Sequence, residues 1–315
     1  MQVFHSFEEA QDYTATVVAL GTFDGVHLGH QMVMKTAIDT ARRLQAKAVV
    51  VTFAAHPLSV LCPEKEPARL ATVKQKERYI KELGLDGLVL LPMNRHLIDE
   101  SPDEFCQQLL DYLHPKSVVV GANFTYGARA AGNTETLRDF MDGHGVPVQV
   151  LHLLERPGRA TPISSTVIRK LVLLGHMETA ASLLGRPFEI EGMVVEGDRR
   201  GRLIGFPTAN MEIPPRMAMP PDGVYVTDVF VDGAYRPAMT NIGDNPTFTN
   251  QYRRIETHII NWQGDIYGKC LCVRFYKRLR HEIPFQTTEA LQRQMEQDQV
   301  DTLNYLDDND RTCFK

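Results

Sequence analysis

The ten residues GTFDGVHLGH, Gly21 to His30, place two imidazole side chains three positions apart. They come after an apolar run and before a helix-like stretch, so we expect His27 and His30 on one helix face, pointing at the same place. Unpaired backbone N–H groups in the first turn and the helix dipole attract anions there. Gly29, between the histidines, lets a phosphate or a flat ring approach the backbone. The stretch therefore predicts a phosphate site whose imidazoles stabilise charge as a reaction proceeds.

Other phosphate-binding patterns are missing from the sequence, which contains no G-x-x-x-x-G-K-[ST] motif and no G-x-G-x-x-G motif. Taken without their neighbours, the two histidines could also be a solvated pair at a helix start or a pair of zinc ligands. The chain holds five cysteines, an odd number that argues against a disulfide framework. Cys270 and Cys272 would share one face of a strand, where we expect them to pack as small apolar groups rather than to bind a metal.

A second stretch that could do chemistry is GFPTAN, Gly205 to Asn210. In an extended segment Thr208 and Asn210 face the same way and present a hydroxyl and an amide oxygen. Such oxygen ligands suit Mg²⁺, and Gly201 and Gly205 allow phosphates to approach the backbone. The structural alternative is a Pro–Thr–Ala–Asn turn with an asparagine cap.

Glu256 is the carboxylate of the second half that could take part in a reaction. In RRIETHII, strand alternation places it on the face opposite Ile255, Thr257 and Ile259. A glutamate in such a position is usually a solvated surface group. Beside a hydroxyl substrate, however, it would act as a general base.

The patterns around these residues divide the chain in two. Through the first half, short apolar runs alternate with helix-like segments, which predicts a parallel sheet covered by helices on both faces. The runs are ATVVAL, AKAVVVTF, LDGLVLLP, KSVVVGANF and VPVQVLHLL, and the helices include HLGHQMVMKTAIDTARRL, VKQKERYIKELG and PDEFCQQLLDYL. The first helix should bury one face, made of Met34, Ala37, Ile38, Ala41 and Leu44. Sheets of this kind bind ligands beyond the carboxyl ends of their strands.

After about residue 185 the segments, from LLGRPFEIEGMVVEG onward, become strand-like and are separated by turn residues. Their spacing predicts an antiparallel barrel or sandwich, followed by a polar helix from about Thr287. The expected fold class is therefore α/β and then β, with one domain at residues 1–185 and another at 186–315. A length of 315 residues is in accord with two domains.

Charge and hydropathy exclude several classes of partner. The net charge of −5 gives no reason to expect binding to nucleic acid. The first residues lack the basic and apolar parts of a signal peptide, and no apolar run approaches the roughly 18 residues that cross a bilayer. We expect a cytoplasmic protein without a membrane partner, and a homo-oligomer is compatible with the sequence.

The chain resembles a known family along nearly its whole length. LGTFDGVHLGHQ is similar to the GxFDxxHxGH signature of nucleotidyltransferases, and more closely to the start of the bacterial bifunctional riboflavin kinase/FAD synthetases. VTFAAHPLSVL, RLATVKQKERYIKELGLD, VVVGANFTYGARAAGN and ISSTVIRKLVLLGHMETAASLLGRPF follow in the family's order. In the second half RRGRLIGFPTANM, PDGVYV, NIGDNPTF, IETHIINWQGDIYGK and RLRHEIPF resemble riboflavin kinases.

The resemblance implies a Rossmann-like nucleotidyltransferase domain followed by a small six-stranded antiparallel riboflavin kinase barrel. The barrel would phosphorylate riboflavin with ATP to give FMN, and the first domain would adenylylate FMN to FAD and release pyrophosphate. The partners would be riboflavin, FMN and ATP, with Mg²⁺ as the cofactor. A kinase whose first domain is inactive, and a non-catalytic flavin and nucleotide binder, are alternatives. A glycerol- or choline-phosphate cytidylyltransferase would share the opening motif but leave the second half unexplained.

In the first domain the resemblance assigns catalysis to His27, His30 and Arg169, whose planar guanidinium offers a fork of donors to the β- and γ-phosphates. Nucleotide or flavin contacts are implied for Gly21, Phe23, Asp24, Gly29, Asn123, Ser165 and Thr166. Asn123 stands where many members carry aspartate, and only aspartate is charged. An FMN phosphate is already an anion, so this domain needs donors and positioning rather than a base.

In the second domain the resemblance implies that Gly201, Gly205, Thr208 and Asn210 bind the nucleotide. Thr208 and Asn210 would also hold Mg²⁺. The acceptor here is a primary hydroxyl of riboflavin, a poor nucleophile until its proton is removed, and Glu256 would be the general base.

Overall fold

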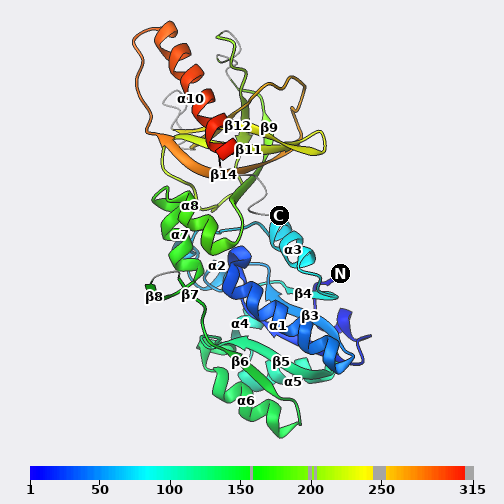
Figure 1. Cartoon of the computed structure of the whole chain (residues 1–315). Coiled ribbons are helices and arrows are strands. Elements are labelled where there is room, and N and C mark those ends of the chain that lie inside the picture. The colour runs from blue at the N-terminus through cyan, green and yellow to red at the C-terminus, as the bar shows by residue number, and fades with distance from the viewer. Residues whose placement is uncertain (157–158, 198–200, 202–203, 244–252, 309–315) are drawn as a thin grey trace. The chain divides into compact units, whose positions relative to one another are not determined.

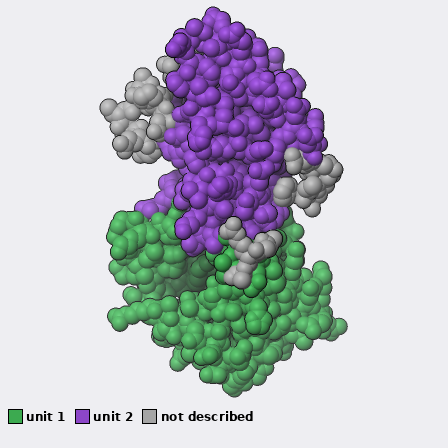
Figure 2. Space-filling view, turned by 60° about the vertical axis from the view of Figure 1, so that its left-hand side comes forward, with its two compact units in different colours: residues 1–165 green, residues 166–315 purple. Residues whose placement is uncertain are grey.

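A computed structural model of the chain describes residues 1–156, 159–197, 201, 204–243 and 253–308. The chain forms two compact units, residues 1–165 and 166–315, coloured separately in Figure 2. None of the helices in the described ranges combines the length and apolar character that a membrane span needs.

The first unit is built on a parallel sheet of six strands in the order β1-β4-β3-β2-β5-β6. The strands are β1 (Gln2–Phe4), β2 (Thr16–Leu20), β3 (Lys47–Phe53), β4 (Gly87–Leu91), β5 (Pro115–Gly121) and β6 (Val148–Leu151). Each predicted apolar run forms one of the strands β2 to β6. The edge strand β1, which pairs with β4, was not predicted by the sequence patterns.

Helices cover both faces of this sheet (Figure 1). The principal helices are α1 (Leu28–Leu44), α3 (Val73–Glu82), α5 (Pro102–Leu113) and α6 (Thr134–Gly143). Val17 and Ala19 of β2 belong to the core beneath α1 and α3, whereas Val18 and Leu20 belong to the core beneath α5 and α6. This alternation confirms the predicted sheet with helices on both sides.

One residue of the predicted buried helix face is placed differently. Met34, Ala37, Ile38 and Ala41 are buried, but Leu44 is 47% exposed. Leu44 is the last residue of α1, and Gln45 follows it in the left-handed region at φ 52°. The chain turns away there, so the apolar stripe ends one turn earlier than the sequence indicates.

The remaining elements of the first unit are short. They are the helices α2 (Leu58–Leu61) and α4 (Arg95–Asp99), the strands β7 (Glu155–Arg156) and β8 (Arg159–Pro162), and the 3-10 turns η1 (Glu8–Ala10), η2 (Asp24–Val26), η3 (Pro63–Lys65) and η4 (Ala128–Ala130).

The second unit is a closed antiparallel barrel in the order β10-β13-β12-β11-β14-β9. Its strands are β9 (Phe188–Val195), β10 (Ala209–Glu212), β11 (Gly223–Val231), β12 (Ala234–Gly243), β13 (Arg254–Ile259) and β14 (Cys270–Arg280). The helices α7 (Ser165–Leu173) and α8 (Met177–Leu184) precede it, and α10 (Thr288–Asp308) follows it. The predicted barrel and C-terminal helix are confirmed. The expected strand at LLGRPFEIEGMVVEG is shorter than predicted, because its first residues end α8.

The inside of the barrel contains a short chain of buried hydroxyl groups. The hydroxyls of Thr227 and Thr240 lie 2.8 Å apart, and those of Thr240 and Thr257 lie 2.9 Å apart. Thr227 also donates to the carbonyl of Ala238 at 2.9 Å. Because these polar groups satisfy one another, they are buried without the cost of an unpaired hydroxyl.

Two buried carboxylates brace the outside of the barrel. Asp298 of α10 accepts hydrogen bonds from Arg280 of β14, with Nε 3.0 Å from both carboxylate oxygens. Asp228 of β11 is fully buried and accepts from Nε of Arg274 at 2.7 Å and from the hydroxyl of Tyr276 at 2.9 Å.

Asp228→Ala should lower the free energy of unfolding of the second unit by about 3–5 kcal/mol, because it leaves a largely buried guanidinium without its partner. Denaturant unfolding followed by the fluorescence of Trp262, the single tryptophan, measures the loss. Asp301→Ala is the matched control, since Asp301 is exposed on α10 and accepts a hydrogen bond from Gln297 at 2.9 Å. It should change stability by less than about 0.5 kcal/mol. Equal losses in the two variants would contradict a bracing role for Asp228.

Candidate functional sites

The first candidate site lies beside β2, where the order in which the chain adds strands to the sheet reverses. From β2 the chain moves outward through β3 and β4, and it returns to the other side of β2 at β5. Open α/β sheets bind ligands at the carboxyl ends of strands at such a point. The motif GTFDGVHLGH follows β2 directly, and the exposed Asn123 follows β5. The topology therefore brings Asn123 to the same edge as the motif.

The backbone of this motif is tightly wound. Phe23 and Val26 have φ of 48° and 41°, a left-handed conformation that non-glycine residues seldom adopt. A Cβ on Gly21 would lie 2.6 Å from the ring of Phe23, so Gly21 makes room for that ring. The Phe23 ring is buried and meets His30 edge-on, with centroids 5.2 Å apart. Gly21 and Phe23 thus support His30, which is a role that the sequence did not indicate.

The two histidines lie against each other. Their rings stack with centroids 3.5 Å apart and planes at 22°, so the expected proximity of His27 and His30 is present. His27 is the N-cap of α1, and its Nδ1 accepts the backbone N–H of His30 at 3.3 Å. A nitrogen that accepts a hydrogen bond carries no proton, so His27 is neutral and keeps its proton on Nε2. From the sequence we expected the N–H groups of the first turn to be available to an anion. The N–H of His30 is not available, because it is bonded to His27.

Gly29 also serves the histidine pair. A Cβ on this residue would lie 3.2 Å from Cε1 and 3.3 Å from Nδ1 of His27, which is closer than ordinary contact. The missing side chain therefore leaves space for the imidazole. Its expected role beside a phosphate stays a prediction.

Asp24 and Ser165 join distant parts of the first unit. The carboxylate of Asp24 accepts the backbone N–H of Leu70 at 3.1 Å, and its carbonyl accepts the hydroxyl of Ser165 at 2.9 Å. Ser165 is the first residue of α7. Thr166, which is exposed, and Arg169, which is half-buried, follow it on the same helix.

Lys76 is a feature of this edge that the sequence analysis missed. It lies in the first turn of α3 and is buried, and its Nζ donates to the carbonyls of Thr22 at 3.0 Å and Phe53 at 2.9 Å. Burial lowers the pKa of Lys76 to about 8, although the nearby Asp24 raises it. A cavity of about 40 Å³ beside it is bordered by Asp24, His56 and Arg69. No signal in the sequence distinguishes Lys76 from the other lysines of α3.

The second candidate site is on the outer face of the barrel. Glu256 of β13 stands opposite Asn210 of β10 on one side and opposite Asn241 of β12 on the other. Residues directly opposite in neighbouring strands share a face, so the three side chains lie in a row. Ile255 and Thr257 are fully buried while Glu256 is half-buried, which confirms the predicted alternation.

Of the two expected metal ligands, Asn210 belongs to this row and Thr208 precedes Asn210 by two residues. The side-chain oxygen Oδ1 of Asn210 is buried and has no hydrogen-bond partner among the described residues. A Cβ on Gly197 would overlap the amide of Asn210, and one on Gly201 would lie 3.6 Å from Cγ2 of Thr208. The side chain of Asn210 therefore lies beside Gly197, and that of Thr208 lies beside Gly201. Gly205 is exposed and has φ of 86°, which favours glycine.

His258, two residues after Glu256 on β13, was also missed by the sequence analysis. Its Nδ1 lies 2.8 Å from the carbonyl of Pro207, and its ring meets Phe206 edge-on. Burial lowers the pKa of His258, and Nδ1 is the donor of this bond because a carbonyl oxygen can only accept. This hydrogen bond fixes the backbone immediately before Thr208.

A pocket of about 290 Å³ opens at one end of the barrel. Thr208 and Thr257 border it, together with the apolar and aromatic side chains of Ile259, Trp262 and Tyr267. Its lining suits a flat aromatic group. The part of the motif NIGDNPTF that follows Gly243 lies outside the described residues.

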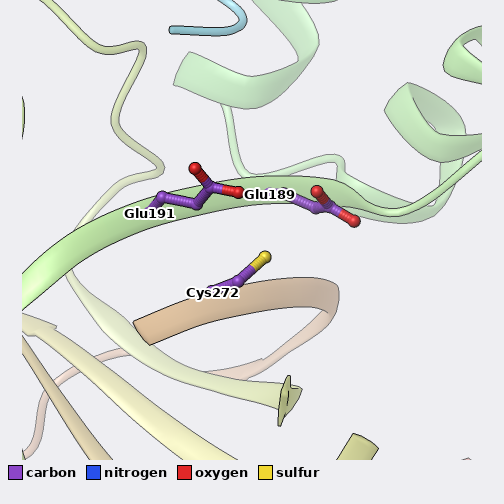
Figure 3. Close-up of side chains that lie close together, drawn as sticks. All are labelled: Glu189, Glu191 and Cys272. Carbon is purple, nitrogen blue, oxygen red and sulfur yellow. The ribbon is translucent and has the colours of Figure 1, made fainter. Parts of the chain in front are cut away.

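A group of three side chains on the outside of the barrel is close enough to share an ion (Figure 3). The ligand atoms of Glu189, Glu191 and Cys272 lie within 4.8 Å of one another. Each of these residues also has another interaction partner, and we assign no metal to the group. Cys270 is exposed, so the expected apolar packing is wrong for this cysteine.

Comparison with known proteins gives the same two halves. Residues 9–167 match the family described as FAD synthetase, and residues 184–306 match the family described as riboflavin kinase. The bifunctional riboflavin kinase/FMN adenylyltransferase of Bacillus subtilis is 37% identical over 306 residues, covering 96% of this chain and 95% of the relative. The protein of the same name from Escherichia coli K12 is 32% identical over 286 residues, covering 90% of each. A crystal structure titled as a macrolide-efflux protein from Streptococcus pneumoniae superposes with a TM-score of 0.85 at 32% identity, covering 96% of this chain and 99% of that one.

Proposed function

Since the chain belongs to the family of bifunctional riboflavin kinase/FMN adenylyltransferases, we propose that it carries out both reactions. The barrel phosphorylates riboflavin with ATP to give FMN. The other half joins FMN to the adenylyl group of ATP, giving FAD and pyrophosphate. The observation that carries this proposal is that one chain holds both the stacked His27–His30 pair after β2 and the Asn210–Glu256 pair on the barrel.

We place the division between the halves near residue 185. The match to riboflavin kinase starts at residue 184, which supports this position. By this division the helices α7 and α8, which lie almost wholly in the second compact unit, belong by function to the adenylyltransferase half, together with the phosphate motif of Ser165, Thr166 and Arg169. We also propose that the enzyme works in the cytoplasm, where ATP is available.

In adenylyl transfer, an oxygen of the FMN phosphate attacks the α-phosphorus of ATP, and the bond to the β-phosphate oxygen breaks. The attacking oxygen is already charged, so no base is required. His27 presents Nε2–H as a donor to the phosphoryl oxygens, because its Nδ1 is held by the backbone of His30. Arg169 and Thr166 bind the departing pyrophosphate, and Asn123 contacts the flavin substrate.

In the kinase reaction the primary hydroxyl of riboflavin attacks the γ-phosphorus of ATP, the bond from that phosphorus to the β,γ-bridging oxygen breaks, and ADP leaves. Glu256 takes the proton of this hydroxyl. It is half-buried between two asparagines, and the amide of one of them, Asn241, donates to the carboxylate of Glu282 at 3.2 Å.

Thr208 and Asn210 would hold the Mg²⁺ that accompanies ATP. The fit is supported by Oδ1 of Asn210, a buried oxygen that has no hydrogen-bond partner among the described residues and can therefore accept a ligand. When bound, the ion neutralises negative charge on the phosphates. His258 keeps the backbone before Thr208 in place through Pro207.

The nucleoside part of this ATP occupies the pocket of about 290 Å³ at the end of the barrel. Trp262 and Tyr267 offer aromatic surface to a purine ring, and Thr208, one of the two proposed metal ligands, also borders the pocket. Gly201 and Gly205 lie on the phosphate side, where the backbone must come close.

The direct test is to incubate purified protein with riboflavin, ATP and Mg²⁺ and to separate the flavins by chromatography. FMN and then FAD should form. In a second reaction, FMN and ATP should release pyrophosphate. Folded protein that makes FMN but releases no pyrophosphate from FMN and ATP would leave only the kinase, and one that binds flavin without turnover would contradict the whole proposal.

Glu256→Gln should reduce riboflavin phosphorylation by about 10²–10⁴-fold, because the amide cannot take a proton. Synthesis of FAD from supplied FMN should be unchanged. Rates of both reactions on the same preparation measure the effect. Glu212→Gln, an exposed carboxylate at the end of neighbouring β10, is the control and should leave both rates as they are.

His27→Asn should show the opposite pattern. Asparagine can still cap α1, but it lacks the Nε2–H donor, so FAD synthesis from FMN should fall by about 10²-fold or more. Riboflavin phosphorylation should be unchanged, and His30→Ala should behave in the same way. His5→Ala, at an exposed histidine of the same unit, serves as the control. Parallel losses of both activities would refute the division of labour.

A further inference from the structure

Lys76 is the only lysine that is buried among the described residues. It lies at the carboxyl edge of the sheet in the first unit, in the first turn of α3. That turn begins at a capping box, in which the side chains of Thr72 and Gln75 bond to each other's backbone N–H groups. The start of the helix is therefore well fixed, and it directs Lys76 toward the ends of β2 and β3.

Burying an ammonium group is expensive, and lysine is among the residues least often buried. Here two neutral carbonyl oxygens compensate part of this cost, those of Thr22 at 3.0 Å and Phe53 at 2.9 Å. An apolar residue would fill the same space without the desolvation cost. The presence of a lysine indicates that the two hydrogen bonds themselves are needed.

The two carbonyls belong to loops that leave neighbouring strands. Phe53 is the last residue of β3, and Thr22 lies between Gly21 and Phe23 in the motif after β2. Among the described residues, the last backbone hydrogen bond between the two runs from the N–H of Gly21 to the carbonyl of Val51 at 3.4 Å, one residue before Thr22. Past that bond, side chains make the connection: Lys76 donates to the carbonyls of Thr22 and Phe53, and the hydroxyl of Thr52 also donates to the carbonyl of Thr22 at 3.0 Å.

Titratable groups of both charges surround the ammonium group of Lys76. The negative charge of Asp24 in η2 stabilises the ammonium and raises its pKa, whereas the positive charge of Arg69, before α3, lowers it. Arg69 is itself paired with Glu66, with Nη2 2.9 Å from Oε1. His56, after β3, borders the same cavity.

We propose that Lys76 is a positioning residue for FMN adenylylation, whose ammonium ties the loop after β2 to the end of β3 and so holds the stacked His27–His30 pair in place. This inference rests on the adenylyltransferase activity proposed above for the same half. Lys76 acts through the backbone of Thr22 and need not touch a substrate.

Loss of the proton weakens this connection. Burial brings the pKa of Lys76 to about 8, below the ordinary 10.5 of a lysine. Above that pH the amine keeps only two N–H groups and loses its attraction to Asp24. A guanidinium at the same position would stay charged throughout this range.

The test compares Lys76→Met, Lys76→Arg and the matched control Lys74→Met, an exposed lysine of the same helix. Pyrophosphate release from FMN and ATP is measured at saturating and limiting substrate in the full chain. Lys76→Met should lower kcat by about 10- to 100-fold with little change in KM, as expected when a reacting group is misplaced. Lys76→Arg should recover part of the rate, and Lys74→Met should match the wild type. Riboflavin phosphorylation by the same preparations should be equal in all of them.

The pH profile separates positioning from a merely structural role. Wild-type FAD synthesis should decline above about pH 8, and that decline should be missing from Lys76→Arg. A Lys76→Met enzyme with wild-type kcat, or an identical alkaline decline in the wild type and Lys76→Arg, would overturn the inference. If Lys76→Met does not fold, the comparison of wild type with Lys76→Arg still decides. A wild type that releases no pyrophosphate would refute the proposed function instead.

Discussion

Successive side chains of a β-strand point to opposite sides, and both candidate sites depend on this constraint. In β13 it sends Ile255 and Thr257 into the barrel and leaves Glu256 and His258 outside. The strand can therefore be packed on one side and do chemistry on the other. In β2 the same alternation divides the apolar side chains between two cores, so that both sides are used for packing. Side chains that take part in a reaction can therefore be placed only after the strand, and GTFDGVHLGH begins directly after β2.

The two sites are consequently stabilised in different ways. On the barrel, neighbouring strands supply the row of Asn210, Glu256 and Asn241, and ladder hydrogen bonds hold its spacing. In the described part of the first unit the ladder continues only to the residue after each strand, as in the bond from the N–H of Gly21 to the carbonyl of Val51, and side chains provide connections beyond it. Lys76 joins Thr22 to Phe53, and His27 caps the helix that carries His30. A loop site of this kind depends on more residues than the motif contains.

Most of the architecture was predictable, because the spacing of apolar residues along a long segment indicates which of its faces is buried. The apolar runs predicted β2 to β6, and the strand pattern of the second half predicted an antiparallel barrel or sandwich, of which the family resemblance indicated the barrel. The three-residue β1 is too short to show a period, and Leu44 continued the helical stripe past the point where Gln45 turns the chain. The identity of the motif residues was also readable, but their contacts were not. The partners of Lys76 and His258 lie 54, 23 and 51 positions away, and no local pattern encodes them.

The threonine chain inside the barrel has a fixed polarity. Thr227 gives its single hydroxyl hydrogen to the carbonyl of Ala238, so Thr240 must donate to Thr227, and Thr257 must donate to Thr240. Thr257 also borders the pocket at the end of the barrel. Because its hydrogen is donated to Thr240, the hydroxyl of Thr257 can only accept a further hydrogen bond. Any further polar partner of the Thr257 hydroxyl must therefore be a hydrogen-bond donor, as an amino group is and a carbonyl is not.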